Sequence, residues 1–99
     1  MARFDVHPRP DGPGYLLDVQ SDLLGRLNTR VVVPLLPGES GPAPAQRLNP
    51  GFTVHGKTVW MHTQFMAAIP AGELGAPLAR LDHEREAILS AIDFLHQGW

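Results

Sequence analysis

Five histidines are the residues best suited to bind a metal ion or to carry protons: His7, His55, His62, His83 and His96. No two of them stand four residues apart, the spacing that places two imidazoles on one face of a helix, and no carboxylate completes a known metal-binding spacing. The sequence contains no cysteine, which excludes thiolate ligands, disulfides and cysteine nucleophiles. We therefore expect no metal site and no cofactor.

Serine and aspartate side chains offer a second kind of chemistry, that of a hydrolase triad. Ser21 and Ser40 are candidate nucleophiles, but neither stands in a Gly-x-Ser-x-Gly motif. Asp5, Asp18 and Asp22 fall at expected strand ends and turns, where aspartate accepts hydrogen bonds from the backbone. Structural roles are the favoured interpretation of all three, and we expect no catalytic residue.

The elements that must position these side chains are short, because 10 glycines and 10 prolines interrupt the 99 residues. A chain of this length fits a single domain, residues 1–99. It has no long apolar run and no basic leader before an apolar segment, so we expect a cytoplasmic protein that does not enter a membrane. The net charge is -2 and the arginines are scattered, which argues against direct nucleic-acid binding.

Alternating or β-branched apolar residues predict six strands, at residues 3–7, 15–19, 30–36, 52–54, 57–61 and 64–70. His55 and Gly56 are expected to form a tight hairpin turn, because glycine tolerates the left-handed conformation. Loops are expected at residues 8–14, 37–44 and 71–79, and residues 37–44 are the best candidate for a mobile loop.

The last segment changes from strand to helix periodicity, with apolar residues at helical spacing in Leu81, Ile88, Ile92 and Leu95. This pattern predicts a helix over residues 83–97, with Asp82 as its N-cap and Gly98 as the residue of positive φ beyond its end. The fold class is therefore mainly β, an antiparallel barrel or sheet with one C-terminal helix packed across it.

Two adjacent leucines stand out, because Leu23 and Leu24 lie between Asp22 and Gly25 in a segment whose composition predicts a turn. Leucine is among the residues most often buried, so a place in the core is one interpretation. An exposed contact for a partner is the other. The residues alone leave both open.

Five segments resemble the CcdB toxins of bacterial toxin–antitoxin modules: residues 15–24, 27–35, 66–70, 81–86 and 91–95. The first contains the specific element Asp-Val-Gln-Ser-Asp, and together the segments span the chain. The resemblance implies a CcdB-like barrel related to SH3 barrels, formed as a two-fold homodimer. A homodimer is also the commonest way to cover the surface that a small barrel with an apolar helix leaves exposed.

The same resemblance implies a function by binding. Toxins of this family bind the A subunit of DNA gyrase and trap the complex in which gyrase has cleaved DNA, and a CcdA-like antitoxin with a disordered tail binds and removes the toxin. Catalysis then belongs to gyrase, and the toxin is not an enzyme. The resemblance assigns the gyrase contact to the leucine pair and to the end of the helix: Leu23, Leu24, Asp93, His96, Gln97, Gly98 and Trp99.

The sequence departs from the family pattern at its end, where the best-known members place a tryptophan before the glycine and an aliphatic residue last. Here Gln97 precedes Gly98, and Trp99 is the last residue. A terminal indole can still stack on an arginine of a partner, a contact that contributes about 0.5 to 2 kcal/mol.

Two alternatives to gyrase poisoning stay open. A MazF/Kid-like endoribonuclease toxin shares the barrel, and its chemistry would need a proton carrier and a phosphate-stabilising cation, for which His62 and Arg30 are the candidates. The other alternative is a diverged CcdB homologue that keeps the dimer and its antitoxin but no longer kills.

Overall fold

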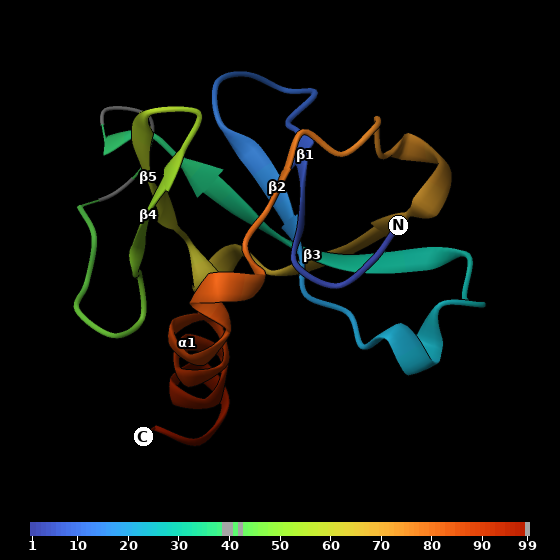
Figure 1. The fold of residues 1–99 in the computed structure, drawn as a ribbon. Coiled ribbons are helices and arrows are strands. Elements are labelled where there is room, and N and C mark those ends of the chain that lie inside the picture. The colour runs from blue at the N-terminus through green and yellow to red at the C-terminus, as the bar shows by residue number, and fades with distance from the viewer. Residues whose placement is uncertain (39–40, 42, 99) are drawn as a thin grey trace.

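The computed structural model describes residues 1–38, 41 and 43–98, and Figure 1 shows them as a curled antiparallel sheet with one helix at the C-terminal end. Over these residues the strands follow the order β4-β5-β3-β2-β1-β7, and β6 also pairs with β3. The sheet forms a nearly closed barrel. The strands are β1 (Asp5–Pro8), β2 (Tyr15–Asp18), β3 (Thr29–Leu36), β4 (Gly51–Val54), β5 (Lys57–Met61), β6 (Ala67–Pro70) and β7 (Ala79–Arg80).

The predicted mainly β fold class with a C-terminal helix is confirmed, as are the first three strands to within two residues at each end. Ser40 and Trp99 lie outside the described residues, and so does part of the loop expected at residues 37–44. In the part of the chain that the structure describes, no helix is long and apolar enough to cross a membrane.

The strand β3 joins the two halves of the barrel. Its first four residues pair with β6, its last two pair with β5, and Val32 to Leu35 pair with β2. Side chains that alternate along β2 and β3 enter the core, where Leu17, Val33 and Leu35 are fully buried. The central position of β3 follows from its valine run, because a β-branched segment suits a strand with neighbours on both sides.

The β4–β5 hairpin turns at His55 and Gly56, as predicted. Their φ angles are 49° and 77°, so both central residues are left-handed, the geometry of a type I′ turn. The flanking residues Val54 and Lys57 are the last pair of the ladder. The turn therefore fixes the register of this hairpin.

Two strand predictions need correction. Residues 64–70 do not form one strand, because Thr63–Phe65 is a 3-10 turn, η3, and β6 begins only at Ala67. Two backbone hydrogen bonds close that turn, from the N–H groups of Phe65 and Met66. The short strand β7, which pairs with β1, was not predicted, since two residues are too few to show a period.

The C-terminal helix α1 (Arg85–Gln97) begins two residues later than predicted. Residues Asp82–Glu84 form a 3-10 turn, η5, and Asp82 is not the N-cap, because the guanidinium of Arg80 occupies its carboxylate. At the other end Gly98 has a φ of 83° and donates its N–H to the Phe94 carbonyl oxygen at 2.9 Å, which confirms the predicted C-cap.

The helix packs on the barrel near its start, where Ile88 and Ala91 are buried. Its C-terminal end points away from the barrel in Figure 1. Leu95, near that end, is 37% exposed. The helix is therefore not packed across the sheet along its whole length.

We predict that Gly14→Ala destabilises the fold by on the order of 2 kcal/mol, because forcing a side chain into a disfavoured conformation costs about 1 to 3 kcal/mol. Gly14 has a φ of +99°, and a Cβ there would lie 2.3 Å from the Leu35 carbonyl oxygen. Urea denaturation measures the change. The matched control is Gly72→Ala, where a Cβ meets nothing within 4 Å. Equal losses in the two variants would contradict the prediction.

Candidate functional site

The Asp-Val-Gln-Ser-Asp segment, residues 18–22, begins at the last residue of β2 with a buried ion pair between Asp18 and Arg30. The Arg30 side chain donates from Nε to Asp18 Oδ2 at 2.7 Å and from Nη2 to Asp18 Oδ1 at 2.9 Å. Both side chains are almost completely buried, at 2% and 0% exposure. Asp18 Oδ1 also accepts the Gln20 backbone N–H at 3.0 Å. Each carboxylate oxygen is thus satisfied, which a buried charge requires.

Gln20 connects this ion pair to the turn that follows. Its side-chain oxygen accepts the Val31 backbone N–H at 3.0 Å, and its side-chain nitrogen donates to the Leu24 carbonyl oxygen at 2.9 Å. Ser21 Oγ accepts the Leu23 backbone N–H at 3.2 Å and caps the 3-10 turn η1 (Asp22–Leu24). The turn is therefore held at both ends, by Ser21 where it begins and by Gln20 where it ends.

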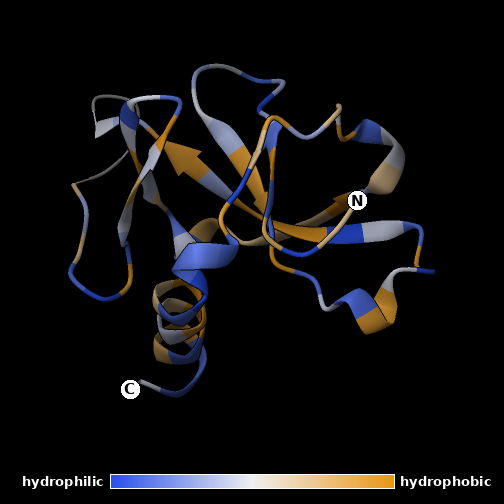
Figure 2. Ribbon diagram, in the orientation of Figure 1, coloured by the Kyte–Doolittle hydropathy of each residue, from blue (hydrophilic) through white to orange (hydrophobic). Residues whose placement is uncertain are grey.

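This turn and the residues that follow it present three leucines to solvent. Leu23 is 94% exposed, Leu24 50% and Leu27 51%, so the interpretation that placed the leucine pair in the core is wrong. Figure 2 shows the hydrophobic colour of η1 on the outside of the barrel. We call Leu23, Leu24 and Leu27 the apolar knuckle. Sequence reasoning missed Leu27, although three leucines within five residues of a turn were a usable signal.

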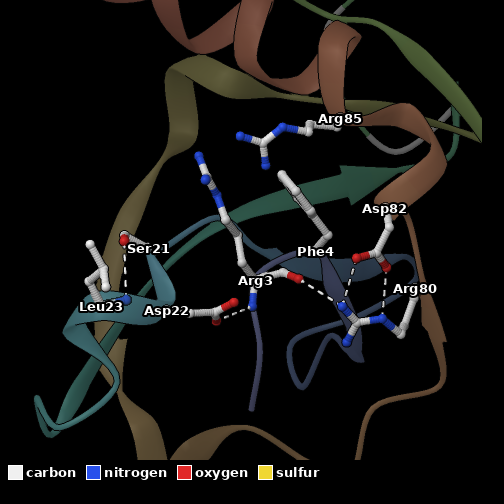
Figure 3. A pocket seen from close by; sticks show the side chains of 8 residues that line it. All are labelled: Arg3, Phe4, Ser21, Asp22, Leu23, Arg80, Asp82 and Arg85. Carbon is white, nitrogen blue, oxygen red and sulfur yellow. Dashed lines mark hydrogen bonds and ion pairs between the residues drawn. The ribbon is translucent and has the colours of Figure 1, made fainter.

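A polar hollow of about 260 Å³ lies beside the knuckle (Figure 3). Its lining comes from four separate segments and comprises Arg3, Phe4, Ser21, Asp22, Leu23, Arg80, Asp82 and Arg85. Arg80 donates to Asp82 at 2.7 and 2.8 Å and is also paired with Asp5. Hydrogen bonding between Arg80 and Asp82 lowers the pKa of Asp82 and raises the pKa of Arg80, so both side chains remain charged near neutral pH.

The aspartates perform the structural roles expected of them. Asp5 accepts the backbone N–H of Ala2 at 2.9 Å, and Asp22 accepts that of Arg3 at 2.9 Å. Asp18 belongs to the buried ion pair. Among the described residues, no group of three or more histidine and acidic side chains is placed to hold a metal ion.

The helix-end residues proposed for partner contact lie elsewhere on the molecule. Asp93, His96, Gln97 and Gly98 are exposed, and Trp99 lies outside the described residues. Figure 1 places the end of α1 well apart from η1. Within one chain, the structure does not bring the knuckle and the helix end together.

The two residues considered for ribonuclease chemistry are both inside the fold. Arg30 is 2% exposed and bound to Asp18, and His62 is 1% exposed. Burial lowers the pKa of His62, which favours the neutral imidazole, and its ring stacks on Phe65. Neither side chain is accessible to an RNA strand, so the hypothesis that this pair cleaves RNA is wrong.

These features define a small, nearly closed antiparallel barrel with a single C-terminal helix and an exposed apolar turn. A solved structure of this fold is an endoribonuclease in complex with its cognate antitoxin, from mycobacterial species. It superposes with a TM-score of 0.80 at 16% sequence identity, covering 100% of this chain and 98% of the other. No curated protein matches the sequence.

The family model described as CcdB protein matches residues 3–98. The chain therefore belongs to the CcdB family, the toxins of toxin–antitoxin modules.

We predict that Arg30→Met lowers the free energy of unfolding by about 3 to 5 kcal/mol, because it leaves the Asp18 carboxylate buried without its partner. Thermal and urea unfolding measure the loss. The exposed Arg26 is the control, and Arg26→Met should change stability by less than about 0.5 kcal/mol. A small effect of Arg30→Met would show that the ion pair does not hold this segment.

Proposed function

We propose that the protein is a toxin that binds the A subunit of DNA gyrase and traps gyrase with its DNA cleaved. The observation that carries this proposal is the apolar knuckle, whose Leu23 is 94% exposed on a turn fixed by hydrogen bonds. Exposed apolar groups of this kind mark interaction surfaces. Because the turn is already ordered, binding loses little conformational entropy there.

The end of α1 is the second part of the proposed contact, through Asp93, His96, Gln97, Gly98 and Trp99. The first four are exposed, and they lie in the last two turns of the helix or at its C-cap. Aromatic anchors dominate protein interfaces, which favours a direct role for the indole of Trp99.

A homodimer accounts for the separation between these two surfaces. One chain presents the knuckle and the helix end far apart, whereas a two-fold pair offers two copies of each to a single target. The face of α1 that carries Leu95 is the surface that we propose pairs, because this leucine is 37% exposed.

An antitoxin of the CcdA type is the second proposed partner. The mycobacterial endoribonuclease of the same fold was solved with its cognate antitoxin, which supports a similar partnership for this barrel. The proposed action of the toxin is binding without catalysis. Its net charge of -2 gives no support for sequence-specific binding of nucleic acid.

In a supercoiling assay with purified gyrase, we predict inhibition and a trapped cleavage complex. The double variant Leu23→Asp and Leu24→Asp should abolish both, because it removes the apolar contact, and so should deletion of residues 97–99. The unfolding temperature of the double variant should stay nearly unchanged, since the substituted side chains are exposed, and the deletion should cost only the Gly98 cap of the helix. The control is Leu78→Asp, which alters a leucine that is 45% exposed outside both proposed contact surfaces and should leave inhibition unchanged.

Full supercoiling at saturating toxin, with no cleaved DNA, would refute the proposal. A long single-stranded RNA incubated with the same preparation should remain intact, and its cleavage would favour the endoribonuclease alternative. Growth arrest on induction in a gyrase-sensitive host is expected, and continued growth would favour a diverged homologue that no longer kills.

Sedimentation equilibrium should give the mass of a dimer, and Leu95→Asp should shift the equilibrium toward monomer, because it puts a charge into the proposed apolar interface. The exposed Leu78→Asp variant should remain dimeric. A monomer for the unmodified chain would contradict this part of the proposal.

A further inference from the structure

Two arginines beside the knuckle converge on one aromatic ring. The guanidinium carbons of Arg3 and Arg85 lie 5.0 and 5.8 Å from the centroid of the Phe4 ring. Arg3 precedes β1 and Arg85 begins α1, so only the fold brings them together. Figure 3 shows their side chains directed toward one another next to Phe4, within the lining of the polar hollow.

Neither arginine has a carboxylate partner among the described residues, where the ion pairs involve Arg30 and Arg80. Arg80 takes the nearby carboxylates of Asp5 and Asp82. The third carboxylate, that of Asp22, accepts the backbone N–H of Arg3 and not its guanidinium. The hollow therefore holds two guanidinium groups that form no ion pair with the nearby carboxylates.

The side chain of Arg3 shows the need for an acceptor directly. Its Nε is buried and has no hydrogen-bond partner. Buried donors in folded proteins are almost always satisfied, and two cations against one ring also repel each other. An anion bound between Arg3 and Arg85 would supply the acceptor and relieve the repulsion.

The surroundings favour a carboxylate over a phosphate. Asp22 and Asp82 line the same hollow, and their charge repels a dianion more strongly than a single carboxylate. An arginine fork matches the two oxygens of a carboxylate. Leu23, 94% exposed, forms another part of the lining, so an apolar group can follow the acid.

We propose that the hollow between Arg3 and Arg85 binds the carboxylate of an acidic residue in a partner peptide, with the neighbouring apolar residue of that peptide on Leu23. This subsite favours partner segments in which an acidic residue stands next to an apolar one. It does not depend on gyrase being the target.

The test is an NMR titration of the Nε–Hε signals of Arg3 and Arg85 at constant ionic strength. The probe is the capped peptide Gly-Glu-Leu-Gly, and its Gly-Gln-Leu-Gly counterpart removes only the charge. The glutamate peptide should shift both signals saturably. The glutamine peptide should bind about tenfold more weakly, the loss expected when a charge-assisted hydrogen bond is removed.

Arg85→Gln should weaken binding of the glutamate peptide by about tenfold for the same reason, and it alters an exposed side chain. Arg3→Lys keeps the charge but loses the fork, so it should weaken binding less than Arg85→Gln. Lys57→Gln makes the same change in net charge on the β4–β5 hairpin and should leave the affinity unchanged. Backbone amide spectra confirm that each variant is folded.

Equal binding of the two peptides, or equal weakening by Lys57→Gln, would overturn the proposal. Inorganic phosphate forms a separate arm, and tighter binding of phosphate than of the glutamate peptide at these two signals would overturn the choice of ligand. None of these measurements involves gyrase, so failure here is distinct from failure of the proposed function.

Discussion

The buried ion pair between Asp18 and Arg30 is the constraint on which the proposed binding surface depends. Two charges removed from water are tolerable only when each finds its partner with good geometry, and here both carboxylate oxygens and the guanidinium meet that condition. The pair fixes where β2 ends relative to β3. Gln20 then links β3 to the turn η1, through hydrogen bonds to Val31 and Leu24. An exposed leucine pair can keep one conformation because a buried polar network beneath it is complete.

Much of the fold could be predicted from sequence, because its signals are local. The alternation at residues 3–7, the apolar residues at 15–19, the valine run of β3, the His55-Gly56 turn and Gly98 are each signals from a few adjacent residues. The errors occurred where a particular side-chain contact, or pairing with a strand elsewhere in the chain, decides the local structure. Arg80 takes the carboxylate of Asp82 and displaces the start of the helix, a contact that helix periodicity does not report.

The candidate site was predictable only in part. Residue statistics favoured burial for Leu23 and Leu24, and the resemblance to CcdB toxins pointed instead to the exposed position that the structure has. The hollow had no sequence signal, because Arg3 and Arg85 lie near opposite ends of the chain. Neither composition nor spacing reveals that Arg3 and Arg85 lie against one ring while Asp5 and Asp82 pair with Arg80.

The continuity of β3 through both halves of the barrel has a consequence for how the molecule opens. Thr29 to Val32 form the ladder with β6, and Leu35 and Leu36 form the ladder with β5, so melting either half strips backbone partners from the other. Partial opening is thereby disfavoured and unfolding approaches an all-or-none transition. For a protease that needs an extended segment, the residues of these ladders would thus become accessible only in the rare global unfolding events of the domain.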